Sequence, residues 1–187
     1  MRILISNDDG IYSGGIRALA EGIAKNDEVY VVAPDRERSA TGHSLTLHRP
    51  LRLEEETHLK NVKAAYSTDG TPSDCVKIAI GAILKEPPEI VLSGINHGPN
   101  MGADVMYSGT VSAAMEGAIY NIPSIAISLA DHKPQDFTAA VTFVSKLIKI
   151  IGQIKFPDRT LLNINVPALP LSEIAGVEIT ELGVRPY

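Results

Sequence analysis

The chain has 187 residues, of which 44% are hydrophobic and 5% aromatic, and it carries a formal net charge of -5. This length and composition fit one domain, residues 1–187, with a core made mostly of aliphatic side chains. Acidic and basic residues are interspersed without a basic stripe, so a nucleic-acid polymer is not an expected partner. No apolar run reaches the roughly 18 residues that indicate a membrane span. We therefore expect a cytoplasmic protein without a membrane partner.

Apolar segments with strand and helix character alternate along the chain. The first is a strand at 2–6, followed by a turn at 10–15 and a helix at 16–24. Further strands are predicted at 28–33, 64–67, 89–92, 124–128 and 161–166, and further helices at 71–84, 110–120 and 137–151. Such alternation indicates an open, mostly parallel sheet with helices on both faces. We predict an α/β, Rossmann-like three-layer fold.

Two segments between these elements have a different character. Residues 35–60 are polar and rich in Arg, His and Thr, and residues 44–48 alternate between polar and apolar. We interpret this stretch as a functional loop followed by one or two strands, which would add a β-hairpin extension to the sheet. Residues 93–109 are rich in glycine, and a loop of that length inside a compact domain is typically functional.

Three polar loops are expected at one edge of the sheet. They are residues 7–10, 35–39 and 93–98, and each directly follows a predicted strand. Because ligands of open α/β sheets bind at the carboxyl ends of the strands, we predict the functional site among these loops.

Asp8 and Asp9 are the most informative pair in the sequence. Two adjacent carboxylates at the end of a buried strand repel each other and lose hydration, which is costly unless a cation neutralises them. Ser39 and Asn96 could complete an oxygen shell of the kind that Mg²⁺, Mn²⁺ or Ca²⁺ prefers, and no Cys/His cluster suits zinc. The alternative is that the two acids form only a turn and a helix cap, with Gly10 supplying the turn.

The segment Ser108-Gly109-Thr110 stands directly before an alanine-rich helix. Free backbone N–H groups and the positive end of the helix dipole make such a turn a ready site for phosphate. The alternative is an ordinary N-cap by Ser108 or Thr110. Neither G-x-G-x-x-G after the first strand nor G-x-x-x-x-G-K-[ST] is present, so we expect neither a dinucleotide cofactor nor a P-loop ATPase.

Longer motifs follow one another along the chain. They are MRILISNDDGI (1–11), VVAPDRERSATGHSLTL (31–47), STDGTPSDCV (67–76), VLSGINHGPNMG (91–102), YSGTVSAAMEGA (107–118) and LLNINVP (161–167). In this order and register they resemble the SurE (survival protein E) family of acid-phosphatase-like 5′-nucleotidases. The resemblance covers the chain from Met1 to about Pro167.

The resemblance implies an activity and a set of site residues. Members of the family remove phosphate from nucleoside 5′- and 3′-monophosphates, some also act on short polyphosphate, and they need a divalent cation, usually Mg²⁺ or Mn²⁺. On this chain the implied metal ligands are Asp8, Asp9, Ser39 and Asn96, of which the two acids are also the implied catalytic residues. The implied substrate-binding residues are Asn96, Ser108, Gly109, Thr110, Gly42 and His43.

The resemblance also implies self-association. Members of the family form homodimers or tetramers through an exchanged C-terminal segment, and they continue beyond the position of Arg185, Pro186 and Tyr187. We therefore expect the swapped segment to be largely missing from this sequence.

Metal-assisted hydrolysis with Asp8 as the general base is the expected mechanism. Two other interpretations of the acidic pair stay open. In an aspartyl-phosphate phosphatase Asp8 would be the nucleophile, although such enzymes favour an Asp-x-Asp pattern. In a receiver-like signalling module the pair would bind Mg²⁺ without catalysis. Such modules place a phosphorylated Asp after a third strand, whereas Ser93 and Gly94 follow the strand at 89–92 here.

Overall fold

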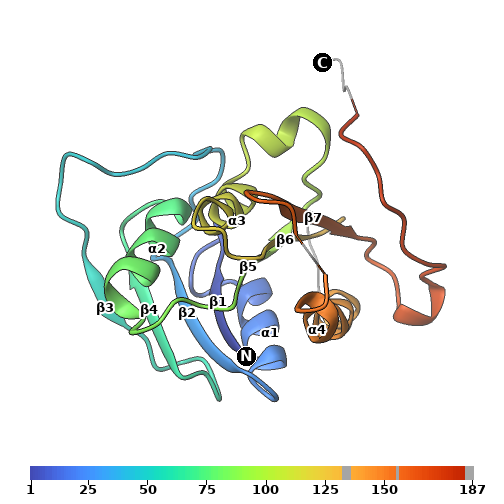
Figure 1. Cartoon of the computed structure of the whole chain (residues 1–187), viewed down its shortest axis with the longest axis horizontal. Helices are drawn as coiled ribbons and strands as arrows, with labels where there is room; N and C mark the ends of the chain where they lie inside the picture. Colours follow the sequence, from blue (N-terminus) through green and yellow to red (C-terminus); the bar gives the residue numbers. More distant parts are fainter. Residues whose placement is uncertain (132–135, 155, 184–187) are drawn as a thin grey trace.

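The computed structural model describes residues 1–131, 136–154 and 156–183, and the strands in this part of the chain form one sheet (Figure 1). They are β1 (Arg2–Ser6), β2 (Glu28–Pro34), β3 (Leu53–Glu55), β4 (Ala64–Thr68), β5 (Ile90–His97), β6 (Ser124–Leu129) and β7 (Leu161–Val166). Their order is β3-β4-β2-β1-β5-β6-β7, and all neighbours are parallel except β3 and β4. The predicted mostly parallel sheet is confirmed, and the antiparallel β3–β4 pair is the hairpin at its edge.

Helices cover both faces of the sheet, as Figure 1 shows. On one face, α1 (Gly14–Ile23) packs beside α4 (Thr138–Ile151). On the other, α2 (Pro72–Ile78) and its π-helical continuation η1 (Ala79–Ile83) pack beside α3 (Gly109–Ile119). The 3₁₀ turns η2 (Gly102–Met106) and η3 (Leu171–Glu173) lie in connecting segments. This is the predicted three-layer α/β fold.

The central strand β1 shows why the sheet is specified so clearly. Ile3 and Ile5 face the core under α1 and α4, whereas Leu4 faces the core under α2, and all three are 0% exposed. A parallel strand buried on both faces needs an unbroken apolar run, which is the pattern that predicted it.

Helix starts also follow the sequence signals. Thr71 caps α2 in a reciprocal capping box with Asp74, and Ser108 caps α3 by accepting a hydrogen bond from the Val111 amide at 3.1 Å. A further cap, Ser13 at the start of α1, was not predicted. Among the described residues, no helix is long and apolar enough to span a membrane.

Two segments differ from their prediction. β5 continues beyond residue 92 to His97, with an irregular register opposite β6 between Ser93 and Asn96. Gly94 permits this, because its φ is +139° and a Cβ there would lie 2.3 Å from the Ile127 carbonyl oxygen. Residues 44–48 alternate in sequence but form no strand, because their backbone bonds to the N-cap Thr71 and to Asp74 in the first turn of α2 instead of to a neighbouring strand.

The segment after β7 extends away from the sheet (Figure 1). In its described part, up to Gly183, it has no helix or strand apart from η3, and its apolar side chains at Val177 and Ile179 are 71% and 102% exposed. Arg185, Pro186 and Tyr187 lie outside the described residues.

Candidate functional site

A cavity of about 510 Å³ opens at the carboxyl ends of β1, β2 and β5. These strands are neighbours in the sheet, so the loops that follow them meet at one edge. The cavity is lined by Asp8, Asp9, Glu37, Ser39, Ala40, Asn96, His97, Gly98, Pro99, Asn100, Asp104, Tyr107 and Ser108. The structure thus brings together the four sequence-predicted metal ligands and one of the predicted phosphate-binding residues.

Asp8 is held against the N-terminus of α3. Its Oδ1 accepts a hydrogen bond from the Thr110 hydroxyl, and its carboxylate also accepts one from the Thr110 backbone. Gly109 allows this close approach, because a Cβ on that residue would lie 2.6 Å from the Asp8 Cβ. The positive end of the helix therefore faces a carboxylate of the protein itself.

The pKa values of the two adjacent acids, Asp8 and Asp9, are both raised. Burial raises the pKa of Asp8, and the hydrogen bond from Thr110 opposes that rise. Burial first, and then repulsion by Asp8, raise the pKa of Asp9 to about 6. The Asp9 Oδ2 atom is buried and has no hydrogen-bond partner. A bound cation would relieve both the repulsion and the missing contact.

Ser39 and Asn96 add neutral oxygen atoms beside Asp8 and Asp9. The Asn96 amide nitrogen donates to the Gly98 carbonyl at 2.8 Å, which leaves the side-chain oxygen for a ligand. The Ser39 hydroxyl donates to Glu37 at 2.5 Å and keeps its lone pairs for a cation.

The donor set therefore consists of oxygen atoms. No group of three or more His, Cys, Asp and Glu in the described part of the chain could hold a metal, so a site here depends on serine and asparagine as well as on the acids. Oxygen donors fit Mg²⁺ or Mn²⁺, and also Ca²⁺, better than they fit zinc.

The other predicted substrate-binding residues lie beside the cavity and do not line it. Gly109 and Thr110 are buried against Asp8. Gly42 donates its amide to the Tyr107 carbonyl at 3.2 Å, and His43 Nε2 lies 2.7 Å from Glu116 Oε2. Contact of these four residues with substrate stays a prediction.

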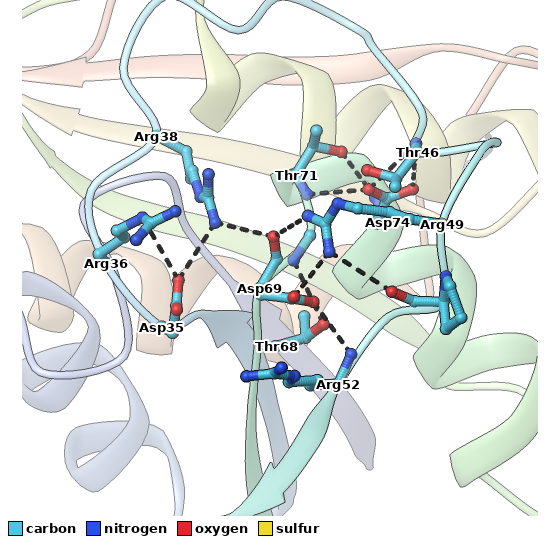
Figure 2. A network of polar contacts seen from close by, with 12 residues as sticks. Asp35, Arg36, Arg38, Thr46, Arg49, Arg52, Thr68, Asp69, Thr71 and Asp74 are labelled. Atoms are coloured by element: carbon cyan, nitrogen blue, oxygen red, sulfur yellow. Dashed lines mark hydrogen bonds and ion pairs between the residues drawn. The ribbon is translucent and has the colours of Figure 1, made fainter.

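Residues 35–52 form the segment that we call the cavity loop, which contains no helix or strand. Figure 2 shows how the turn before α2 and the first turn of α2 hold it. Arg38 and Arg49 each donate to the Asp69 carbonyl at 2.7 Å, and Arg49 also binds the Asp69 carboxylate at 2.6 Å. The Thr46 amide donates to Asp74 at 3.0 Å. Hydrogen bonds that involve side chains thus hold the loop, which has no strand-to-strand backbone hydrogen bonds.

Several residues of the site have no predicted role, although Glu37 lies in one of the loops where the site was predicted. Glu37, Asp104 and Tyr107 line the cavity, and Asp69 and Asp74 anchor the loop. The first three stand within a few positions of predicted residues, which was the available signal. Asp69 and Asp74 lie in one of the quoted motifs but showed only a helix start there.

The fold and the site define a class: open parallel α/β proteins whose ligand site lies at the carboxyl edge of the sheet, beside a helix N-terminus. The family model described as "Survival protein SurE" matches residues 3–187. The chain belongs to the SurE family.

Named relatives agree with this assignment. The "5′-nucleotidase SurE" of Thermosynechococcus vestitus is 56% identical over 190 residues, which span 100% of this chain and 71% of the relative. The protein of the same name from Pelotomaculum thermopropionicum is 52% identical over 187 residues, again 100% of this chain and 71% of the relative. The crystal structure of the SurE protein from Aquifex aeolicus superposes with a TM-score of 0.89 at 44% identity, covering 99% of this chain and 73% of that one.

Proposed function

We propose that this protein is a divalent-metal-dependent 5′-nucleotidase that hydrolyses nucleoside monophosphates to nucleoside and phosphate. The observation that carries the proposal is the acidic pair Asp8-Asp9, with raised pKa values and an unpartnered buried oxygen, at a cavity lined by further oxygen donors. Membership of a family whose named relatives are 5′-nucleotidases supports the substrate class.

Asp8, Asp9, Ser39 and Asn96 would hold the cation. When bound, Mg²⁺ or Mn²⁺ would neutralise charge that develops on a phosphate oxygen. The backbone N–H groups at Ser108 and Gly109, at the start of α3, would stabilise the other phosphate oxygens.

Hydrolysis then needs a water and a proton acceptor. The water attacks phosphorus, the bond from phosphorus to the ester oxygen breaks, and the water gives a proton to a carboxylate. We assign this role to Asp8, because Thr110 and the first turn of α3 fix its orientation. The departing nucleoside oxygen takes up a proton from solvent, and Asp8 releases the proton it accepted to solvent, which restores the carboxylate.

The proposal also covers further substrates, self-association and location. Nucleoside 3′-monophosphates and short polyphosphate are further substrates, and a cavity of about 510 Å³ offers room beyond a single phosphate. We also propose self-association through the part of the C-terminal segment that follows β7, where Val177, Ile179 and Leu182 are exposed. A cytoplasmic location is a further part of the proposal.

Phosphate release from nucleoside 5′- and 3′-monophosphates tests the proposal. We expect release with Mg²⁺ or Mn²⁺, none in EDTA, and recovery when the metal is restored. Asp8→Asn should abolish turnover. Asp158→Asn is the matched control. Asp158 is exposed and lies before the amino end of β7, whereas the cavity lies at the carboxyl ends of the strands. A folded wild-type protein that releases no phosphate in either metal would refute the proposal, and a phosphoenzyme trapped at Asp8 would replace it with the nucleophilic mechanism.

A further inference from the structure

The cavity loop brings Ser39 to the site without any helix or strand to hold it. Its backbone is tethered before Ser39, where the Arg38 amide donates to the Asp8 carbonyl at 2.7 Å. It is tethered again after Ser39, where Gly42 bonds to Tyr107 and His43 contacts Glu116. The position of Ser39 therefore depends on both tethers.

The second tether includes the contact of His43 with the buried carboxylate of Glu116. The Glu116 side chain is 4% exposed, whereas that of His43 is 27% exposed, and 2.7 Å separates Oε2 from Nε2. Lys77 Nζ lies 3.7 Å from the other carboxylate oxygen. A carboxylate taken out of water needs such partners, and His43 supplies its shorter contact. This contact ties the cavity loop to α3.

Helix α3 carries this tether and the contacts of Asp8 on one rigid element. Thr110 at its start bonds to Asp8, and Glu116 in its third turn contacts His43. The two anchor points lie about 9 Å apart along the helix axis, from its rise per residue. A shift of the loop at His43 therefore moves Ser39 relative to Asp8, because Asp8 is fixed by the same helix.

We propose that Glu116 is a positioning residue that, through His43, fixes the cavity loop so that Ser39 completes the oxygen cage around the acidic pair. Glu116 itself would touch neither the cation nor the substrate. It acts on metal affinity by holding the loop, in the manner of outer-shell residues that orient metal ligands. This inference rests on the metal site of the proposed function.

Mn²⁺ binding to the purified protein without substrate tests the inference by calorimetry. We expect Glu116→Ala and His43→Ala each to weaken Mn²⁺ binding about tenfold or more, the lower end of the range for outer-shell partners. The double variant should be little weaker than either single variant, because both remove one shared contact. Glu116→Gln keeps an oxygen that can accept from His43, and it should bind Mn²⁺ much better than Glu116→Ala.

His48→Ala is the matched control, because His48 is an exposed histidine in the same loop. It should bind Mn²⁺ like the wild type. Hydrogen exchange of the amides of residues 39–43 gives a second readout, and it should be faster in His43→Ala than in His48→Ala. His43 lies outside the core, so its variant tests the idea even if Glu116→Ala unfolds.

The outcomes separate the two proposals. Wild-type protein that binds no Mn²⁺ would refute the metal site itself, and this inference with it. Wild-type protein that binds Mn²⁺, with His43→Ala and folded Glu116→Ala binding equally well, would refute the positioning role alone. Additive losses in the double variant would also overturn it, because they would show that the two residues act separately.

Discussion

Gly109→Ala is a sharp test of how α3 positions Asp8. A Cβ on residue 109 would lie 2.6 Å from the Asp8 Cβ and 2.9 Å from its Oδ2. Comfortable contacts between carbon atoms are about 3.5–4.0 Å, so the two groups must separate by about 1 Å. Asp8 lies at the end of β1 and has more room to move into the cavity than the helix has to move away. We therefore expect the carboxylate to be displaced.

The expected effects on stability and activity differ in size. Overpacking costs about 1–3 kcal/mol, and the higher helix propensity of alanine offsets about 1 kcal/mol of this. The free energy of unfolding should therefore fall by at most about 2 kcal/mol. A misplacement of about 1 Å at a reacting centre costs on the order of 100-fold, so kcat/KM for a nucleoside monophosphate should fall by about that factor.

Gly117→Ala provides the matched control on the same helix. Its Cβ would lie 2.5 Å from Ser124 Oγ and 2.7 Å from Val91 Cγ2, so it overpacks the core under α3 away from the cavity. It should lose stability and keep its kcat/KM. Urea unfolding and phosphate release, measured on both variants, separate the two effects. A folded Gly109→Ala protein with wild-type kcat/KM would refute the account of how Asp8 is positioned.

The remaining predictions concern charge and the cavity loop. In EDTA, burial and repulsion raise the pKa of Asp9 to about 6 from the ordinary 3.8, so the folded protein favours protonated Asp9. Deprotonation therefore costs stability, and the free energy of unfolding should fall by up to about 3 kcal/mol as pH rises from 4 to 7. Asp9→Asn should reduce that fall, leaving the part due to the raised pKa of Asp8, and should abolish Mn²⁺ binding; an unchanged pH dependence of urea unfolding would contradict this. Thr110→Val removes a hydrogen bond that opposes the raised pKa of Asp8, so the acid limb of the kcat/KM profile should move to higher pH, whereas Thr110→Ser should leave it in place. Asp69→Ala breaks the pair with Arg49, so limited proteolysis within the cavity loop should become faster while the free energy of unfolding changes by less than about 1 kcal/mol; unchanged proteolysis would show that the loop is held elsewhere.

The parts of the fold that the sequence predicted are those with local causes. Ile3, Leu4 and Ile5 form a short apolar run typical of a strand buried on both faces, and Thr71 with Asp74 is a helix-start signal contained within four residues. The meeting of the loops after β1, β2 and β5 also followed, because parallel strands place their carboxyl ends at one edge.

The parts that the sequence did not predict depend on contacts between distant residues. The extension of β5 to His97 requires pairing with β6 across the irregularity at Gly94, which no local pattern encodes. His43 and Glu116 are 73 positions apart, and nothing near either residue indicates the other. Burial decided the role of Thr110 in the same way, since its hydroxyl faces Asp8 in the structure, and only the fold shows this.

We propose that one cation site is formed by Asp8, Asp9, Ser39 and Asn96. Anomalous diffraction from crystals grown with Mn²⁺ tests it most directly, because the method locates manganese without reference to activity. We expect a peak within coordination distance, about 2.0–2.6 Å, of oxygen atoms of these residues. A fully occupied peak elsewhere, with none at the acidic pair, would contradict the account.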